Sequence, residues 1–149
     1  MKALLTNKWL WIPLATWLVV QFYKLIVEVL TAKGRKINWK RIIGSGGMPS
    51  SHTACITSLA TSIGMTEGFD SPLFALASVF AFIVMYDAAG VRRAAGKQAR
   101  ILNQMMEEDK NINYQEKLVE LLGHTPVEVF VGAIVGIAIG LLFGAIREF

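Results

Sequence analysis

The sequence predicts an all-α integral membrane protein, built as a helical bundle of about four transmembrane spans. Two observations support this fold class. Hydrophobic residues make up 54% of the 149-residue chain and its mean hydropathy is +0.47, whereas soluble domains contain roughly 45–50% apolar residues. The charged residues gather between apolar stretches that are long enough to cross a hydrocarbon core of about 30 Å.

Four stretches are predicted to form the spans. The first carries tryptophans suited to the membrane interface. The second is short and rich in alanine, serine and threonine, which is typical of a helix packed inside protein rather than against lipid. The third and fourth are strongly apolar, and a turn over residues 67–72 precedes the third. The predicted spans cover residues 9–30, 50 to about 65, 73–89 and 126–146.

Residues 91–122 are amphipathic and charged, and we expect two surface helices that break around Lys110 and Asn111. Lysine and arginine are retained in the cytoplasm, so this segment and residues 31–49 are placed on the cytoplasmic side, in a bacterial cytoplasmic membrane. The supporting bases are Lys33, Arg35, Lys36, Lys40, Arg41, Arg92, Arg93, Lys97, Arg100, Lys110 and Lys117. The turn before the third span carries Glu67 and Asp70, while Lys2 and Lys8 oppose this orientation.

A chain of this length corresponds to one domain, so residues 1–149 are predicted to form a single domain. The net charge of +4 comes from clustered charges, not from the basic face of a soluble nucleic-acid binder, and no nucleic-acid partner is expected. Cys55 has no second cysteine to pair with. No cleavable signal peptide is expected, because the first apolar stretch is long enough to span the membrane.

The predicted topology brings four polar motifs to one membrane face. They are the second half of the first span, the start of the second, the end of the third and the start of the fourth. The first motif contains Lys24 and Glu28, and the others cover residues 46–52, 87–97 and 123–128. Because scattered residues would not fall at one level, we expect these motifs to form a shared site.

The motif over residues 44–53 is a glycine-rich turn that enters a helix. Gly46 and Gly47 precede Ser50 and Ser51, either of which can cap the helix. Free amides and the positive end of the helix dipole suit an anion there. An ordinary capped helix with a flexible entry explains the glycines and serines equally well. His52 favours function, because an ionisable group at a membrane helix end is a functional candidate.

The motif over residues 123–128 has a clear structural explanation for most of its members. Thr125 and Glu128 form a capping box around Pro126. That explanation leaves out His124, which lies four residues before Glu128 and would be oriented by its carboxylate. Glycines then recur every four residues from Gly132 to Gly144, and we interpret them as a helix-packing face.

The motif over residues 86–100 places a carboxylate beside several bases. Asp87 closes an apolar span and needs a partner, for which Arg92 or Arg93 is the candidate. Arg93, Lys97 and Arg100 share one helical face. A juxtamembrane helix that binds anionic headgroups is the alternative interpretation. Two histidines among many cations favour a phosphate cage over a metal site, so no metal and no cofactor are expected.

Taken together, three strings resemble the divergent branch of the type 2 phosphatidic acid phosphatase family, whose relatives include the vanadium haloperoxidases. They are GGMPSSHTA (residues 46–54), VMYDAAGVRRAAGKQA (84–99) and GHTPVEVFVGA (123–133). The resemblance covers nearly the whole chain. It implies a helical bundle with a phosphate pocket at one membrane face.

The resemblance also implies residue roles. Pro49-Ser50-Ser51-His52 is similar to the family's Pro-Ser-Gly-His motif, so the amides of Ser50 and Ser51 would hold phosphate oxygens and His52 would protonate the leaving group. His124 would be the nucleophile, and Glu128 would orient it in place of an aspartate. Lys24, Arg41, Arg92, Arg93 and Lys97 would contribute to phosphate binding, with Asp87, Gly46 and Gly47 in supporting roles.

The chain departs from the family pattern in two motifs. The family's Ser-Arg pair does not precede His124, so Arg92 or Arg93 would have to supply that cation from another helix. The first motif is altered as well: Lys33 and Lys40 have the family spacing with lysine in place of arginine, and Lys24 is an alternative.

The leading functional prediction is a metal-independent phosphatase for a phosphatidyl or polyprenyl phosphate held in the bilayer. The second is a phospholipid-binding or lipid-translocating protein that keeps the pocket with weak or no turnover, which the missing Ser-Arg pair favours. Haloperoxidase chemistry with vanadate is disfavoured, because those enzymes are generally larger and soluble. A homodimer through a glycine-lined or alanine-lined face is also predicted.

Overall fold

The computed structural model describes residues 5–32, 47–108 and 117–145. Its helices are α2 (Lys8–Thr31), α4 (Ser51–Glu67), α5 (Pro72–Ala89), α6 (Val91–Glu108) and α7 (Pro126–Gly144). These described residues contain helices and connecting segments and form no strand. The predicted all-α fold class is confirmed.

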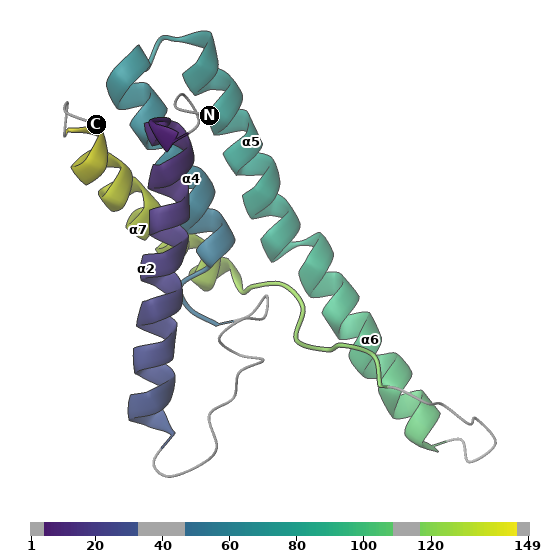
Figure 1. The fold of residues 1–149 in the computed structure, drawn as a ribbon. Coiled ribbons are helices and arrows are strands. Elements are labelled where there is room, and N and C mark those ends of the chain that lie inside the picture. The colour runs from purple at the N-terminus through teal and green to yellow at the C-terminus, as the bar shows by residue number, and fades with distance from the viewer. Residues whose placement is uncertain (1–4, 33–46, 109–116, 146–149) are drawn as a thin grey trace.

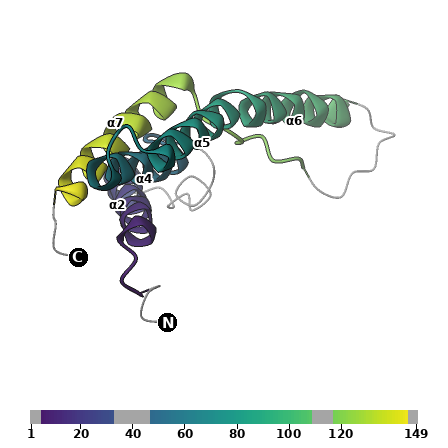
Figure 2. The ribbon, with the colours of Figure 1, turned by 90° about the horizontal axis from the view of Figure 1, so that it is seen from above.

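The helices form a bundle, and α6 projects from it as an arm. Figure 1 shows α2, α4 and α7 gathered together, with α5 running beside them and continuing into α6. Residues 117–124 return alongside α6 toward the start of α7, and we call this segment the strap. Seen from above in Figure 2, α6 extends well outside the bundle. The chain therefore has a packed part and a protruding part.

Helix α4 forms the centre of the bundle and contacts α2, α5 and α7. Its hydroxyl side chains are buried and donate to carbonyls of their own helix, as Thr57 does to Thr53 (2.8 Å) and Ser62 does to Leu59 (2.9 Å). These bonds satisfy the hydroxyls without a solvent contact. The prediction of a helix enclosed by protein is confirmed.

The glycines of α7 lie directly against α4. A Cβ at Gly132 would lie 2.6 Å from the carbonyl oxygen of Ser50, and one at Gly140 would lie 2.7 Å from the Cβ of Thr61. A Cβ at Gly136 would overlap Thr57 and the Ala54 backbone. The predicted packing role of these glycines is confirmed. Their face is occupied by α4 and is therefore not open to a second copy of the chain.

Three described helices are long and apolar enough to cross a membrane: α2, the continuous helix that begins with α5, and α7. Helix α4 has 17 residues, which corresponds to roughly 25 Å, and its composition is less apolar. These three helices surround the shorter α4, so the described part of the chain contains four bundle helices, in line with the prediction of about four. Helix α4 is surrounded by protein, so it does not need a lipid-compatible surface.

Of the two surface helices predicted over residues 91–122, the first is present as α6, which ends at Glu108. The predicted break at Lys110 and Asn111 lies outside the described residues, and residues 117–122 form no helix. In the strap the Leu118 amide donates to Oδ1 of Asn103 on α6, at 2.9 Å, instead of to a helical carbonyl. A contact with another helix therefore takes the place of helical hydrogen bonds at this point of the strap.

Candidate active site

The site forms where α4 and α7 begin and where α5 passes into α6, all at the same level of the bundle in Figure 1. The predicted convergence of the motifs is therefore found in the structure. His124 lies at the centre of this region, with only 3% of its surface exposed. Its amide donates to the carbonyl of Ala88 at 2.9 Å, which ties the strap to the end of α5.

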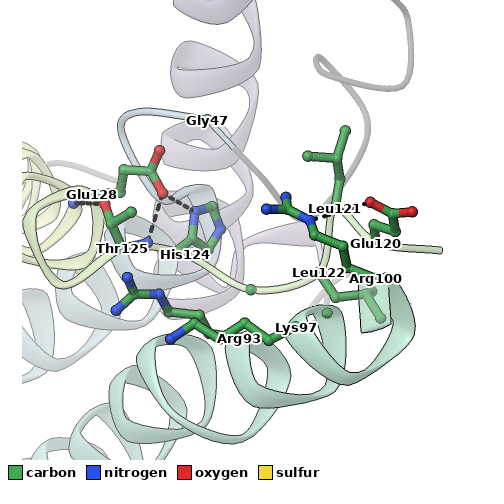
Figure 3. A pocket seen from close by; sticks show the side chains of 12 residues that line it. Gly47, Arg93, Lys97, Arg100, Glu120, Leu121, Leu122, His124, Thr125 and Glu128 are labelled. Atoms are coloured by element: carbon green, nitrogen blue, oxygen red, sulfur yellow. Dashed lines mark hydrogen bonds and ion pairs between the residues drawn. The ribbon is translucent and has the colours of Figure 1, made fainter. Parts of the chain in front are cut away.

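Glu128 lies beside His124 in the first turn of α7. Its Oε2 accepts from the Thr125 amide at 2.8 Å and lies 3.4 Å from Nδ1 of His124. The Thr125 hydroxyl in turn accepts from the Glu128 amide, so the predicted capping box is present. Figure 3 shows the carboxylate between the imidazole and the Thr125 backbone. One carboxylate thus serves both the helix end and the histidine.

The nitrogens of the His124 imidazole keep their capacity to form hydrogen bonds. The Glu128 contact has the distance of an ion pair and not the geometry of a hydrogen bond, and neither ring nitrogen accepts or donates a hydrogen bond within the described residues. Burial lowers the pKa of His124, the charge of Lys24 lowers it further, and Glu128 acts in the opposite direction. The neutral imidazole is therefore favoured near neutral pH.

A cavity of about 320 Å³ opens on one side of His124. Three cations of α6 line it, Arg93, Lys97 and Arg100, and Glu128 and Thr125 lie at its other edge. Figure 3 shows these bases along one face of α6, opposite the histidine. The predicted shared face of Arg93, Lys97 and Arg100 is present, and it faces a cavity that suits an anion.

A second, small cavity of about 20 Å³ brings the two histidines together. His52 and His124 both line it, with Asp87 and Arg92. Such a volume holds about one water molecule. Arg92 donates to Oδ2 of Asp87 at 2.6 Å, so of the two partners predicted for this carboxylate the structure selects Arg92. His124 therefore lies in the wall between the two cavities.

Lys24 approaches the same centre from α2. Its side chain is buried, and its charge acts on Glu128, His52 and His124. His52 is exposed on the first turn of α4, in contrast to His124. The buried lysine and the exposed histidine thus flank the imidazole with different access to solvent.

Ser50 and Ser51 are both buried at the start of α4. Ser50 is the cap, and its hydroxyl accepts from the Thr53 amide at 3.4 Å. Its own amide donates to the Glu128 carbonyl at 3.0 Å, so it is already engaged rather than free for a phosphate oxygen. For Ser51 the amide contact with an anion stays a prediction, because the first turn of a helix leaves its amides without helical partners.

Gly47 has a φ of +85° and lines the larger cavity. Gly46 and Arg41, also predicted to support the site, lie outside the described residues.

Sequence reasoning missed two residues that shape the larger cavity. Glu120 on the strap lines it and contacts Arg100 at 3.4 Å, and a hydrogen bond from Asn103 lowers the pKa of Glu120. Asn103 is buried on α6. The signal in the sequence was the spacing of Gly96, Ala99 and Asn103, which places the asparagine on the face of small residues that α6 buries, but this spacing does not identify its partner.

The fold and this site define a helical integral membrane protein with a histidine and several cations gathered at one face of its bundle. Residues 5–139 match the family described as the Divergent PAP2 family, and the chain belongs to that family. It is 41% identical over 152 aligned positions to the uncharacterized membrane protein YuiD of Bacillus subtilis (strain 168), covering 93% of this chain and 95% of YuiD. No solved structure matches the chain.

Proposed function

We propose that the protein is a metal-independent lipid-phosphate phosphatase acting on a phosphatidyl or polyprenyl phosphate. The observation that carries the proposal is His124, a buried imidazole beside a carboxylate and between two groups of cations. Membership of the Divergent PAP2 family supports the same chemistry. The site lies at the ends of membrane-spanning helices, which favours a substrate anchored in the bilayer.

In the proposed reaction, Nε2 of neutral His124 attacks phosphorus while Nδ1 stays directed at Glu128. The bond between phosphorus and the lipid oxygen breaks, and protonated His52 gives its proton to that oxygen. Water then attacks the phosphohistidine, His52 takes a proton from it, and inorganic phosphate leaves. Arg92 lines the smaller cavity, Arg93 lines the larger one, and the charge of Lys24 acts on His124. In the proposed reaction these fixed positive charges stabilise the phosphoryl oxygens in the transition state.

We place the site on the cytoplasmic face, because basic residues follow α2 and α5 while Glu67 and Asp70 occupy the opposite turn. A cysteine at Asp70 and one at Gln104 of α6, in a Cys55→Ala background, should label from opposite sides of sealed vesicles. Labelling of both positions from one side would contradict this placement.

Phosphate release by the purified protein tests the enzyme. The assay uses phosphatidic acid and a polyprenyl phosphate in nanodiscs, with and without EDTA. His124→Ala should reduce release by at least about 10³-fold, and His52→Ala by roughly 10²–10⁴-fold. Gln98→Ala, on the exposed side of α6, is the matched control and should keep full activity. Release that survives in His124→Ala, or that requires a divalent cation, would refute the proposal.

One observation favours the second candidate, a lipid-phosphate-binding protein with weak or no turnover. The cavity shared by the two histidines holds only about 20 Å³, so a phosphoryl group reaches both imidazoles only if the walls separate. Saturable binding of the same lipids, without phosphate release and with loss of binding in Arg93→Ala, would support this candidate over the enzyme.

A further inference from the structure

We infer that Asn103 is a positioning residue for His124: it holds the strap against α6 and thereby fixes the histidine at the strap's end. The inference rests on the proposed function only in treating His124 as the reactive residue. Nothing in the family motifs points to Asn103, which lies on the arm, away from both histidines in the sequence.

The Asn103 side chain makes three hydrogen bonds to the strap. Its Nδ2 donates to the Leu118 carbonyl at 2.9 Å and to Oε1 of Glu120 at 2.8 Å, and its Oδ1 accepts from the Leu118 amide at 2.9 Å. It is 4% exposed. A carboxamide offers donors and an acceptor in one plane, so it satisfies both backbone groups of Leu118, as a neighbouring β-strand would.

Apolar burial does not explain how the strap is held. Its large apolar residues Leu118, Val119 and Leu121 are 44%, 64% and 62% exposed, and Leu122 is partly covered. The ion pair from Lys117 to Glu107 joins largely exposed side chains, the pair from Arg100 to Glu120 is partly exposed, and such pairs contribute little. The hydrogen bonds of the buried Asn103 therefore give the strap a specific contact that apolar burial and these ion pairs do not.

The backbone of the strap lies directly against the backbone of α6, so a shift of the strap would also shift His124. A Cβ at Gly96 would lie 2.6 Å from the Glu120 carbonyl oxygen, and one at Gly123 would lie 2.8 Å from the carbonyl carbon of Arg92. His124 follows Gly123 immediately and is bonded to Ala88. A strap released at Leu118 would lose this register and let water reach the imidazole.

Charged groups from every neighbouring element face His124, so the pKa of His124 depends on where its side chain lies. They are Lys24 of α2, His52 of α4, Asp87 and Arg92 at the α5–α6 junction, Arg93 and Lys97 across the larger cavity, and Glu128 of α7. Burial is the largest influence on the histidine. If the strap is released, the loss of burial should therefore dominate the change in the pKa of His124.

The test observes His124 directly. The chain has two histidines, so isotope-labelled protein in nanodiscs gives two imidazole signals, assigned with His52→Gln. In Asn103→Ala the His124 midpoint should rise toward about 6.5, and its modification by diethyl pyrocarbonate should speed up at least tenfold. The His52 signal should move less than that of His124, because the two imidazoles line one cavity but His52 is already exposed. Asn103→Gln should restore part of the protection, and Gln104→Ala on the exposed side of α6 should match wild type.

Leu118→Pro provides a second test that leaves Asn103 in place. It removes the amide that donates to Oδ1 of Asn103 and should expose His124 in the same way. A His124 signal unchanged in both folded variants overturns the inference, even if the wild type releases phosphate. A shifted signal in both variants supports the inference, even if no lipid phosphate is hydrolysed and the proposed function fails.

In an active protein, Asn103→Ala should lower kcat more than it raises KM, because the lipid site remains while the nucleophile is misplaced. An equal loss in Gln104→Ala would overturn the positioning role.

Discussion

The contact between α4 and α7 and the contact between α6 and the strap are both close backbone approaches, yet they are stabilised differently. Inside the bundle, the glycines of α7 lie against buried small and hydroxyl residues that bond within their own helix. On the arm, the buried side chain of Asn103 bonds to a non-helical segment most of whose large apolar residues are exposed.

His124 lies at the end of the strap, where the arm meets the bundle, and the site is divided between the two. The bundle supplies Lys24, His52 and Glu128, and the arm supplies the cations of the larger cavity. Small-residue packing has little tolerance for added volume, whereas a strap held by a few hydrogen bonds can open locally. We therefore expect the arm to open locally without unfolding of the bundle.

Gly136→Val should produce the largest effect and tests the bundle side. Added atoms would overlap Thr57 and Ala54, and we expect the free energy of unfolding to fall by about 3 kcal/mol. Unfolding of the purified protein by denaturing detergent, followed by circular dichroism, measures it. Ile137→Val, one position along on the exposed side of α7, is the control and should change stability by less than about 0.5 kcal/mol. Similar curves for both variants would contradict the packing argument.

Gly123→Ala tests the arm side. Gly123 has a φ of +78°, and a side chain there would meet the backbone of Arg92 and Arg93. We expect phosphate release to fall by up to about 100-fold, with helix content and bundle unfolding nearly unchanged. Val119→Ala, an exposed strap residue, should behave as wild type. Global unfolding of Gly123→Ala would show that arm and bundle are not separable.

The pH dependence of stability tests the contribution of His124, which lies at the junction of the bundle and the arm. The pKa of His124 is lowered in the folded state, so below about 6.5 the unfolded chain binds a proton that the folded protein does not. Stability should therefore decrease as pH falls below that value, with a slope of at most about 1.4 kcal/mol per pH unit, until His124 itself is protonated. Subtracting the curve of His124→Gln isolates this contribution, and two parallel curves would disprove it.

The smallest effect is expected for the exposed ion pair of the arm. Lys117 and Glu107 are both largely exposed, so Glu107→Gln should reduce stability by less than about 0.5 kcal/mol, and added salt should abolish the difference. A larger loss, measured in the same unfolding assay, would mean that ion pairs rather than Asn103 hold the strap.

Much of the fold was predictable because its signals are local. The long apolar stretch of α2, the small residues of α4 and the capping box at Thr125 each follow from neighbouring residues. The strap was not predictable, since residues 117–122 have an amphipathic, helix-compatible composition, yet they form no helix and bond to Asn103 of α6.

The sequence by itself determined the helices, the membrane character and the set of polar residues at one level, since hydrophobic length and capping act within a few turns of chain. Only the tertiary structure decided that Arg92 pairs with Asp87, that the Ser50 amide is engaged by Glu128, and that His124 is buried between two cavities. Those outcomes depend on distances between residues far apart in the chain, and these distances are set when the helices and the strap pack.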